Sequence, residues 1–401
     1  MTGVWIRYFS ATSGLGLGND ATLAGLQAGR SALTPCQFET AQISTHVGQV
    51  GGLDAVRLPA PLRAYDCRNN RLAHLGLLQD GFAELVRERV AFWGATRVAV
   101  LIGTSTSGVL ETEIAYRQRD ASGGLAPEFE YDRAHNAFSV TDYVRRAVGA
   151  LGPAVTICTA CSSSAKVFAA AARMLQADLI DAAVVGGVDS LCLTTLYGFQ
   201  SLQLTAPGPC RPFDRHREGL SIGEAAAFAL LERRPESYSA DDILLLGSGE
   251  SSDAHHMSAP HPEGAGARRA MQAALGAAQL TPDQIDYVNL HGTGTQSNDA
   301  AEARAVNALF GAALPCSSTK GATGHALGAA GALEAVICAL SLRDGLMPGG
   351  VTTHEPDPAL PVRYLTANQR APLSRVLSNS FGFGGANCAL LFARADVAGV
   401  S

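Results

Sequence analysis

The stretch Val155-Thr-Ile-Cys-Thr-Ala-Cys161-Ser-Ser-Ser-Ala-Lys-Val-Phe-Ala169 contains the pattern that decides the fold class. It overlaps a short apolar run, residues 154–158, which predicts a buried strand. After Cys161 the chain is rich in alanine and apolar on nearly every helical face, so the helix that follows is expected to be buried. A buried strand that leads directly into a buried helix is typical of a layered α/β protein.

The same alternation recurs along the chain. Short apolar runs bounded by glycine or proline predict further strands at residues 98–103, 182–187, 287–290 and 388–392. Asp20 is expected to be the N-cap of a helix, and Thr281-Pro282 marks another helix start with proline in the first turn. These signals together predict mixed α/β layers.

The length of 401 residues exceeds the usual size of one hydrophobic core, so we expect two domains or two similar halves. The segments that begin at Cys161 and Cys316 both lead into long alanine-rich helices. This is weak evidence for a duplication, because chance explains it equally well in an alanine-rich chain. We therefore divide the chain near its middle, into residues 1–245 and 246–401, with residues 233–242 as a surface connection.

The composition excludes several classes of protein. The chain is 47% apolar and 16% charged with 43 glycines, which excludes a disordered or fibrous protein. The net charge of −6 and the absence of Lys/Arg runs argue against a nucleic-acid surface. Nine scattered cysteines favour a reducing compartment. No secretory signal and no stretch of about 20 apolar residues is present, so we expect a cytoplasmic protein without membrane insertion.

Cys161 is the first candidate for a catalytic residue. A cysteine at a strand-to-helix junction lies where the helix dipole favours the thiolate and where free N–H groups can bind an oxyanion. The alternatives are a small core residue and a redox or metal pair with Cys158. The pair is disfavoured, because no second cysteine pair completes a zinc site and Cys158 is expected inside a buried strand.

Two histidines and an ion pair extend this candidate site. His291 follows the predicted strand at 287–290, where α/β sheets place ligand-binding loops. His325 lies among small residues at a predicted helix start. Each histidine alone is as readily a structural residue as a catalyst. Lys320 and Glu334 are charges in an apolar segment, so we expect them to pair near His325.

Two loops are expected near the same site. The glycine-rich segment 377–387 has two interpretations, an ordinary hairpin or a mobile loop that presents the Phe383 backbone N–H to the nucleophile. The segment with Asp253, His255, His256 and His261 contains metal-ligand residue types, but without ordered spacing. We interpret it as a loop over the site entrance.

Four motifs occur in the order Thr159-Ala-Cys161-Ser-Ser-Ser, His291-Gly-Thr-Gly-Thr, Lys320-Gly-Ala-Thr-Gly-His325 and Asn379-Ser-Phe-Gly-Phe-Gly-Gly. Together they resemble the signatures of the elongating β-ketoacyl-acyl-carrier-protein synthases of the thiolase superfamily. The likeness extends to Gly186-Gly-Val-Asp189, to the segment from Arg211 to Gly219 and to the segment 251–257, so it covers nearly the whole chain. The resemblance implies a thiolase-like five-layered αβαβα fold with two pseudo-symmetric halves.

The resemblance also implies roles for individual residues. Cys161 would be the nucleophile, His291 and His325 would assist malonyl decarboxylation, and Lys320 with Glu334 would support them. The backbone N–H groups of Cys161 and Phe383 would form the oxyanion hole. The implied substrate-binding residues are Thr293 and Thr295, which would contact a phosphopantetheine arm, Phe381 and Phe383, which would gate an acyl pocket, and Thr106, in a segment that lines the pocket in relatives.

The implied reaction is a decarboxylative Claisen condensation of the Cys161 acyl group with malonyl-acyl carrier protein, in fatty-acid or type II polyketide or polyene biosynthesis. No metal or redox cofactor is expected, because release of carbon dioxide drives the condensation. The phosphopantetheine arrives on the carrier protein. The implied partners are acyl carrier protein and a second subunit, in a homodimer or in a heterodimer with a ketosynthase-like chain. Two alternatives stay open: an acyltransferase that does not condense, and a non-catalytic heterodimer partner.

Overall fold

A computed structural model describes residues 3–233, 239 and 241–397 of the chain. Five strands of the first half lie in the main sheet: β1 (Val4–Ser13), β5 (Val98–Gly103), β6 (Ala154–Ile157), β7 (Ala182–Asp189) and β9 (Ala225–Glu232). Their spatial order is β1-β9-β7-β5-β6. β1, β9 and β7 pair antiparallel, whereas β7, β5 and β6 pair parallel.

The second half repeats this arrangement. Its strands are β10 (Ile243–Ser252), β11 (Tyr287–Asn289), β12 (Pro315–Ser317), β16 (Arg375–Phe381) and β17 (Ala386–Arg394), in the spatial order β10-β17-β16-β11-β12. β10, β17 and β16 pair antiparallel, and β16, β11 and β12 pair parallel. Counted along the chain, both halves therefore have the order 1-5-4-2-3 with the same strand directions, which confirms the two pseudo-symmetric halves.

Short pairings complete the sheets. β1 pairs with β10 over three residues, so the two five-stranded sets are joined at one end. β14 (Arg363–Tyr364) extends the sheet beyond β12, and β2 (Gly16–Leu17) pairs with β1. The remaining short strands form two small sheets: β13 (Leu346–Met347) with β15 (Gln369–Arg370), and β3 (Thr34–Pro35), β4 (His46–Gly48) and β8 (Ile222–Gly223).

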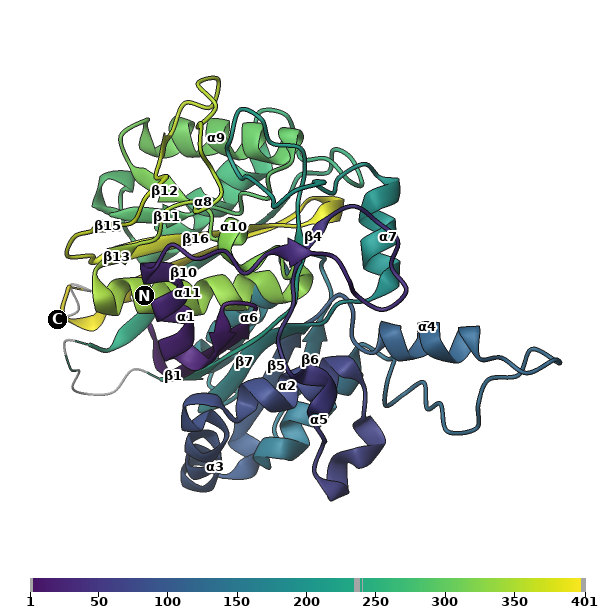
Figure 1. The fold of residues 1–401 in the computed structure, drawn as a ribbon. Helices are drawn as coiled ribbons and strands as arrows, with labels where there is room; N and C mark the ends of the chain where they lie inside the picture. The colour runs from purple at the N-terminus through teal and green to yellow at the C-terminus, as the bar shows by residue number, and fades with distance from the viewer. Residues whose placement is uncertain (1–2, 234–238, 240, 398–401) are drawn as a thin grey trace.

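Helices form the other three layers of the expected αβαβα stack (Figure 1). The central layer contains α6 (Ser163–Gln176) and α11 (Ala330–Asp344), with α1 (Gly18–Gln27) beside them. One outer layer contains α2 (Arg68–Leu77), α3 (Phe82–Trp93) and α5 (Phe138–Val148), and the other contains α8 (Ala265–Ala278) and α9 (Gln296–Phe310). α4 (Val109–Arg117), α7 (Leu193–Ser201) and α10 (Lys320–Thr323) lie outside these layers or in connections.

The two central helices are buried for a reason visible in their sequences. In α11 the residues from Ala330 to Leu342 are all buried. A helix that is apolar on every face gains by contact with both sheets at once, since each buried CH₂ group contributes about 0.8 kcal/mol. Small residues also allow close packing, because a Cβ added at Gly331 would lie 2.6 Å from the Ala165 backbone nitrogen of α6.

Several local predictions differ from the structure. The strand predicted at 154–158 is β6, which ends at Ile157. Among the described strands it pairs only with β5, so it is a partly exposed edge strand rather than a buried one. Cys158 is correspondingly exposed. α1 begins at Gly18 with Leu17 as its N-cap, which places Asp20 in the first turn. Thr281 does form a capping box, but for a single 3-10 turn, Pro282–Gln284.

The division of the chain also shifts. The repeated strand order begins its second copy with β10, so a boundary between residues 245 and 246 falls inside that strand. Most of the connection predicted at residues 233–242 lies outside the described residues. In the part of the chain that is described, no helix has the length and apolar character needed to cross a bilayer.

Candidate active site

Cys161 lies between the edge strand β6 and the N-terminus of the central helix α6. The residue before it, Ala160, has a positive φ of 52°, which is unfavourable for a residue with a Cβ. The turn is held by Ser163, whose backbone N–H and hydroxyl both donate to the Ala160 carbonyl. This tight turn directs the Cys161 side chain into the interior, where the residue is 5% exposed.

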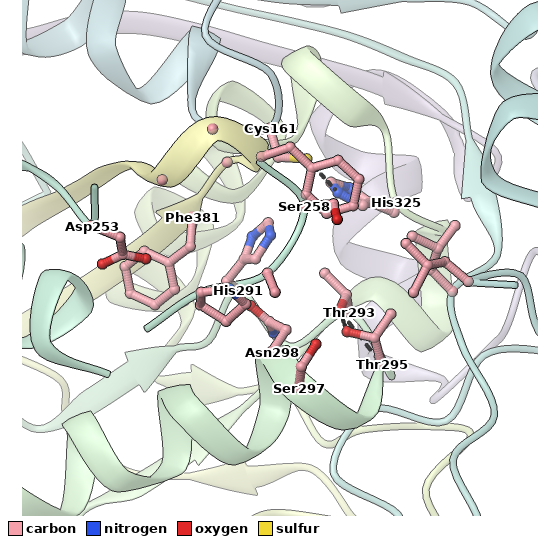
Figure 2. Close-up of a pocket in the computed structure, with 18 of the residues that line it drawn as sticks. Cys161, Asp253, Ser258, His291, Thr293, Thr295, Ser297, Asn298, His325 and Phe381 are labelled. Carbon is pink, nitrogen blue, oxygen red and sulfur yellow. Dashed lines mark hydrogen bonds between the residues drawn. The ribbon is translucent and has the colours of Figure 1, made fainter. Parts of the chain in front are cut away.

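Both predicted histidines lie beside the sulfur. His325 Nε2 is 3.0 Å from Cys161 Sγ, and the rings of His291 and His325 are 5.2 Å apart between centroids. The ligand-type atoms of these three residues all lie within 4.8 Å of one another. Figure 2 shows them around one cavity, although they come from both halves of the chain. The spatial convergence expected from the sequence is therefore present.

The protonation state of Cys161 differs from the sequence-based expectation. Burial raises the pKa of the Cys161 thiol to about 11. Lys320 and the backbone N–H groups of Phe383 and of Cys161 itself lower this pKa, but they do not outweigh burial. The resting residue is thus a thiol, and the 3.0 Å contact with His325 Nε2 provides a base for its proton.

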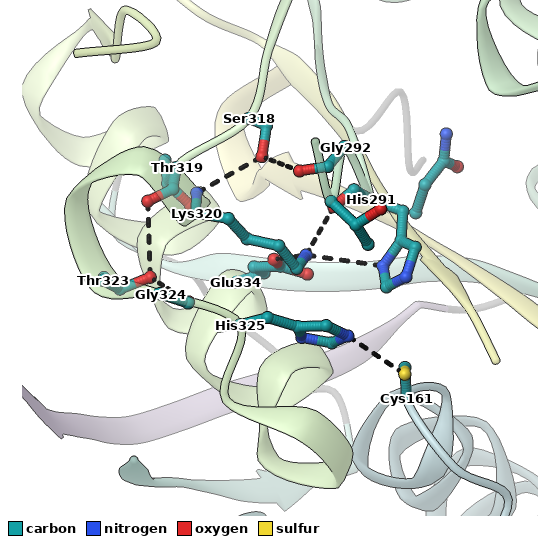
Figure 3. Close-up of polar contacts among 12 residues, drawn as sticks. Cys161, His291, Gly292, Ser318, Thr319, Lys320, Thr323, Gly324, His325 and Glu334 are labelled. Atoms are coloured by element: carbon teal, nitrogen blue, oxygen red, sulfur yellow. Dashed lines mark hydrogen bonds and ion pairs between the residues drawn. The ribbon is translucent and has the colours of Figure 1, made fainter. Parts of the chain in front are cut away.

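Lys320 and Glu334 form the predicted ion pair. Their charged atoms are 2.5 Å apart, and both side chains are at most 3% exposed. The ammonium group contacts His291 rather than His325: it donates to the His291 carbonyl oxygen and lies 3.4 Å from His291 Nδ1 (Figure 3). Since a lysine can only donate, Nδ1 accepts and the His291 ring proton is placed on Nε2.

Both imidazoles are neutral at physiological pH. Burial lowers the pKa of His291 well below its ordinary value, and the charges of Lys320 and His325 lower it further. Burial and Lys320 have the same effect on the pKa of His325. The two rings differ at Nδ1. Lys320 contacts Nδ1 of His291, but His325 Nδ1 is buried and has no hydrogen-bond partner among the described residues.

The glycine-rich loop after β16 closes one side of the site. Gly382 packs so tightly that an added Cβ would lie 2.6 Å from the Thr159 carbonyl oxygen. This close approach brings the Phe383 backbone N–H to the sulfur of Cys161, as predicted. The Phe381 ring lies 5.9 Å from the His291 ring, and the Phe383 ring lies 5.6 Å from that of Phe199.

Cys161 lines a cavity together with His291 and His325. Thr293 and Thr295 line it, with their hydroxyls 2.9 Å apart, and both phenylalanines of the loop also line it. The predicted entrance loop contributes Asp253 and the residues 258–260. Thr106 is not among the lining residues, because its hydroxyl is hydrogen-bonded to the buried Asp189 instead.

Two acidic residues that the sequence analysis did not select hold the His291 loop. Glu302 accepts hydrogen bonds from the backbone N–H groups of His291 and Gly292, both at 2.8 Å. Asp299 accepts from the N–H groups of Thr293 and Gly294. Both residues are at most 1% exposed and lie three positions apart on α9. Two acidic residues at i, i+3 on a helix directly after a histidine loop could have identified them from the sequence, because that spacing places both on one helix face.

The side chains of Cys161, His291 and His325 also contain atoms of the types that bind zinc. Cys161, His291 and His325 are the one converging group of at least three His, Cys, Asp or Glu residues in the described part of the chain. Cysteine thiolate and histidine nitrogen are both ligands that zinc binds in proteins. The Lys320 ammonium beside His291 opposes a cation at this position, however.

Comparisons with known proteins agree with this geometry. Residues 85–237 match the model of the beta-ketoacyl synthase N-terminal domain, and residues 244–354 match that of the C-terminal domain. The chain is 39% identical over 272 residues to "3-oxoacyl-[acyl-carrier-protein] synthase, mitochondrial" of Arabidopsis thaliana, which covers 63% of this chain and 58% of that protein. It is 33% identical over 306 residues to nodulation protein E of Rhizobium meliloti, covering 74% and 76%.

A solved structure is similar over almost the full length. The complex of the ketosynthase ApeO with its chain length factor ApeC from Xenorhabdus doucetiae matches with a TM-score of 0.89 and 38% identity, covering 98% of each chain. The repeated halves and the cysteine between them define a condensing enzyme of the thiolase-like fold. More specifically, the chain belongs to the β-ketoacyl synthase family.

Proposed function

We propose that this protein is a β-ketoacyl-acyl-carrier-protein synthase that loads an acyl group on Cys161 and extends it with malonyl-acyl carrier protein. One observation carries the proposal: the Cys161 sulfur lies 3.0 Å from His325 Nε2 and also meets two backbone N–H groups. These contacts support the assignment of Cys161 as nucleophile, His325 as base and the two N–H groups as oxyanion donors.

In the loading step, the Cys161 sulfur attacks the thioester carbonyl of an acyl carrier, and its proton passes to His325 Nε2. The backbone N–H groups of Cys161 and Phe383 stabilise the oxyanion. The carrier thiolate then leaves and takes the proton from His325, so the imidazole is neutral again. The acyl group remains as a thioester on Cys161.

In the condensation step, the bond between the malonyl carboxylate and the α-carbon breaks and neutral carbon dioxide leaves. The electron pair of that bond stays on the remaining fragment, which becomes an enolate. His291 donates from Nε2, because Lys320 occupies its Nδ1. His325 Nε2 is free once the sulfur is acylated, and it donates after the single ring proton has moved from Nδ1 to Nε2. The α-carbon attacks the acyl carbonyl and expels Cys161, which takes up a proton. No step of the proposed reaction requires a redox cofactor.

We also propose that the protein acts on acyl carrier protein, assembles with a second subunit and lies in the cytoplasm. A chain-length-factor-like partner is supported by the similarity to the ApeO–ApeC complex and by the edge strand β6, whose outer side is unpaired among the described residues and where Val155 is 38% exposed. A homodimer is the competing arrangement. The nine free cysteines favour a cytoplasmic location.

The test is stepwise mass spectrometry of the full chain with acyl- and malonyl-carrier protein. We expect an acyl adduct on Cys161 and then a product two carbons longer on the carrier, with Cys158→Ser as an active control. An adduct without an extended product would identify a non-condensing acyltransferase. Absence of an adduct, alone and with a co-expressed chain-length-factor-like subunit, would identify a non-catalytic subunit.

A further inference from the structure

Asp189 is a buried acidic residue that the reaction described above does not use. It is the last residue of β7 and is 0% exposed. Burial raises the pKa of its carboxyl group, and hydrogen bonds from Thr104, Ser105 and Thr106 oppose this rise. A buried carboxylate is costly unless its oxygen atoms are fully hydrogen-bonded, so the partners of Asp189 indicate what it does.

Most of these partners come from the segment that follows β5. Oδ1 accepts from the Thr104 hydroxyl at 2.7 Å and, at 2.8 Å each, from the backbone N–H groups of Ser105 and Thr106 and the hydroxyl of Thr106. The hydroxyls of Thr104 and Thr106 therefore point to Asp189 and are not available to an acyl chain. Ser105 in turn contacts the carbonyl of Ala160, the residue before the nucleophile, at 3.5 Å.

The other oxygen reaches the second half of the chain. Oδ2 accepts from the backbone N–H of Ala329 at 3.2 Å. Ala329 is the N-cap residue of α11 and provides no side-chain cap itself, so a carboxylate from β7 occupies the positive end of that helix. Ala329 follows His325 by only four residues. Asp189 thus contacts both the segment beside Cys161 and the segment beside His325.

The contact leaves no room for movement. A Cβ added at Gly328 would lie 2.8 Å from Asp189 Oδ2 and 2.7 Å from the Ser105 hydroxyl. The residues flanking the contact, Ser107 and Leu327, both have a positive φ, at 43° and 50°. Such backbone strain persists only where surrounding interactions determine the conformation, and the Asp189 carboxylate is the group that joins these two strained segments.

We propose that Asp189 is a positioning residue that sets the distance between Cys161 and His325 by tying the segment Thr104–Thr106 of the first half to the start of α11 in the second half. Its oxygen atoms are hydrogen-bonded to these two segments rather than to the sulfur, although its charge adds to the burial that raises the pKa of the Cys161 thiol. The kinetic consequence rests on the proposed function, in which the thiol proton passes from Cys161 to His325 during loading and His325 Nε2 takes part in condensation.

The test compares Asp189→Asn with Asp181→Asn in the full chain. Asp181 directly precedes the same strand, but it forms an ion pair of 2.6 Å with Arg97. This pair lies away from the site, so Asp181 is the matched control. We expect Asp189→Asn to lower kcat at least tenfold with the KM for the acyl carrier changed less than about threefold, because the carrier-binding residues are untouched. Asp181→Asn should stay within about twofold of the unsubstituted enzyme. A kcat that is unchanged while the thermal midpoint falls would show a purely structural role and overturn the proposal.

A second series keeps the test decisive if Asp189→Asn does not fold. Thr104→Val removes one hydrogen bond to the carboxylate, whereas Thr104→Ser keeps the hydroxyl, so the serine variant should lose clearly less kcat than the valine variant. Equal losses would contradict the proposal. The rate at which iodoacetamide alkylates Cys161 should also change more than threefold in Thr104→Val but not in Thr104→Ser, two variants that keep the charge of Asp189. This readout needs no condensation activity, so it separates failure of the inference from failure of the proposed function.

Discussion

Replacement of Lys320 by methionine should destabilise the protein in a pH-dependent way. The ammonium group is the ion-pair partner of Glu334, and both side chains are at most 3% exposed. Burial raises the pKa of Glu334 to about 7, while the charge and hydrogen bond of Lys320 lower it. Without Lys320 the carboxyl group of Glu334 is still buried but no longer has a positive charge beside it, so its pKa rises above about 7.

The magnitude follows from the two pKa values of Glu334. A carboxyl group whose pKa is higher in the folded than in the unfolded state, where it is about 4.3, stabilises the fold fully below the unfolded value and loses this contribution as the pH rises to the folded value. Each pH unit in that window lowers the free energy of unfolding by about 1.4 kcal/mol. The loss ends near pH 7 in the unsubstituted protein but continues above it in Lys320→Met. At about pH 8.5 the variant should therefore be a further ~2 kcal/mol less stable relative to the unsubstituted protein, within a total of about 3–5 kcal/mol for a broken buried pair.

The assay is urea unfolding at about pH 6.5 and about pH 8.5, with Lys320→Met/Glu334→Leu as the control. The double variant has no buried carboxyl group at this position, so its stability relative to the unsubstituted protein should lack the added loss at high pH. A destabilisation of Lys320→Met that is equal at the two pH values would refute the reasoning, because it would show that Glu334 does not depend on Lys320 for its ionisation.

Three further results are expected. Alkylation of Cys161 by iodoacetamide should accelerate with pH up to about 11, the pKa to which burial raises its thiol; a plateau near pH 7 would mean that the helix dipole outweighs burial. Glu302→Gln should lower kcat about 10- to 100-fold, because the carboxylate accepts two backbone hydrogen bonds from the His291 loop; decarboxylation of malonyl carrier protein measures this, and an unaltered rate would exclude the role. Gly382→Ala should displace the Phe383 N–H and slow acyl loading of Cys161, since its Cβ would lie 2.6 Å from a carbonyl oxygen; intact-mass kinetics check it, and unchanged loading would show that this N–H is dispensable.

The amino-acid sequence by itself determined several buried elements and the three reactive side chains of the site. The strand 98–103 matches β5, and the alanine-rich segment after Cys161 is the buried helix α6. These predictions succeed because a run of apolar residues, or an all-apolar helical face, has few places to be stable other than the core. The chemical identity of Cys161, His291 and His325 likewise required only motif and spacing.

Only the tertiary structure decided what depends on contacts between distant residues. The thiol pKa of Cys161 reflects burial by both halves, which a helix-start argument cannot include. β6 is an apolar strand that lies at an edge, because strand order is set by pairing rather than by composition. The capping of α11 by Asp189 joins positions 140 residues apart. Such interactions arise from long-range packing, so no local pattern in the chain records them.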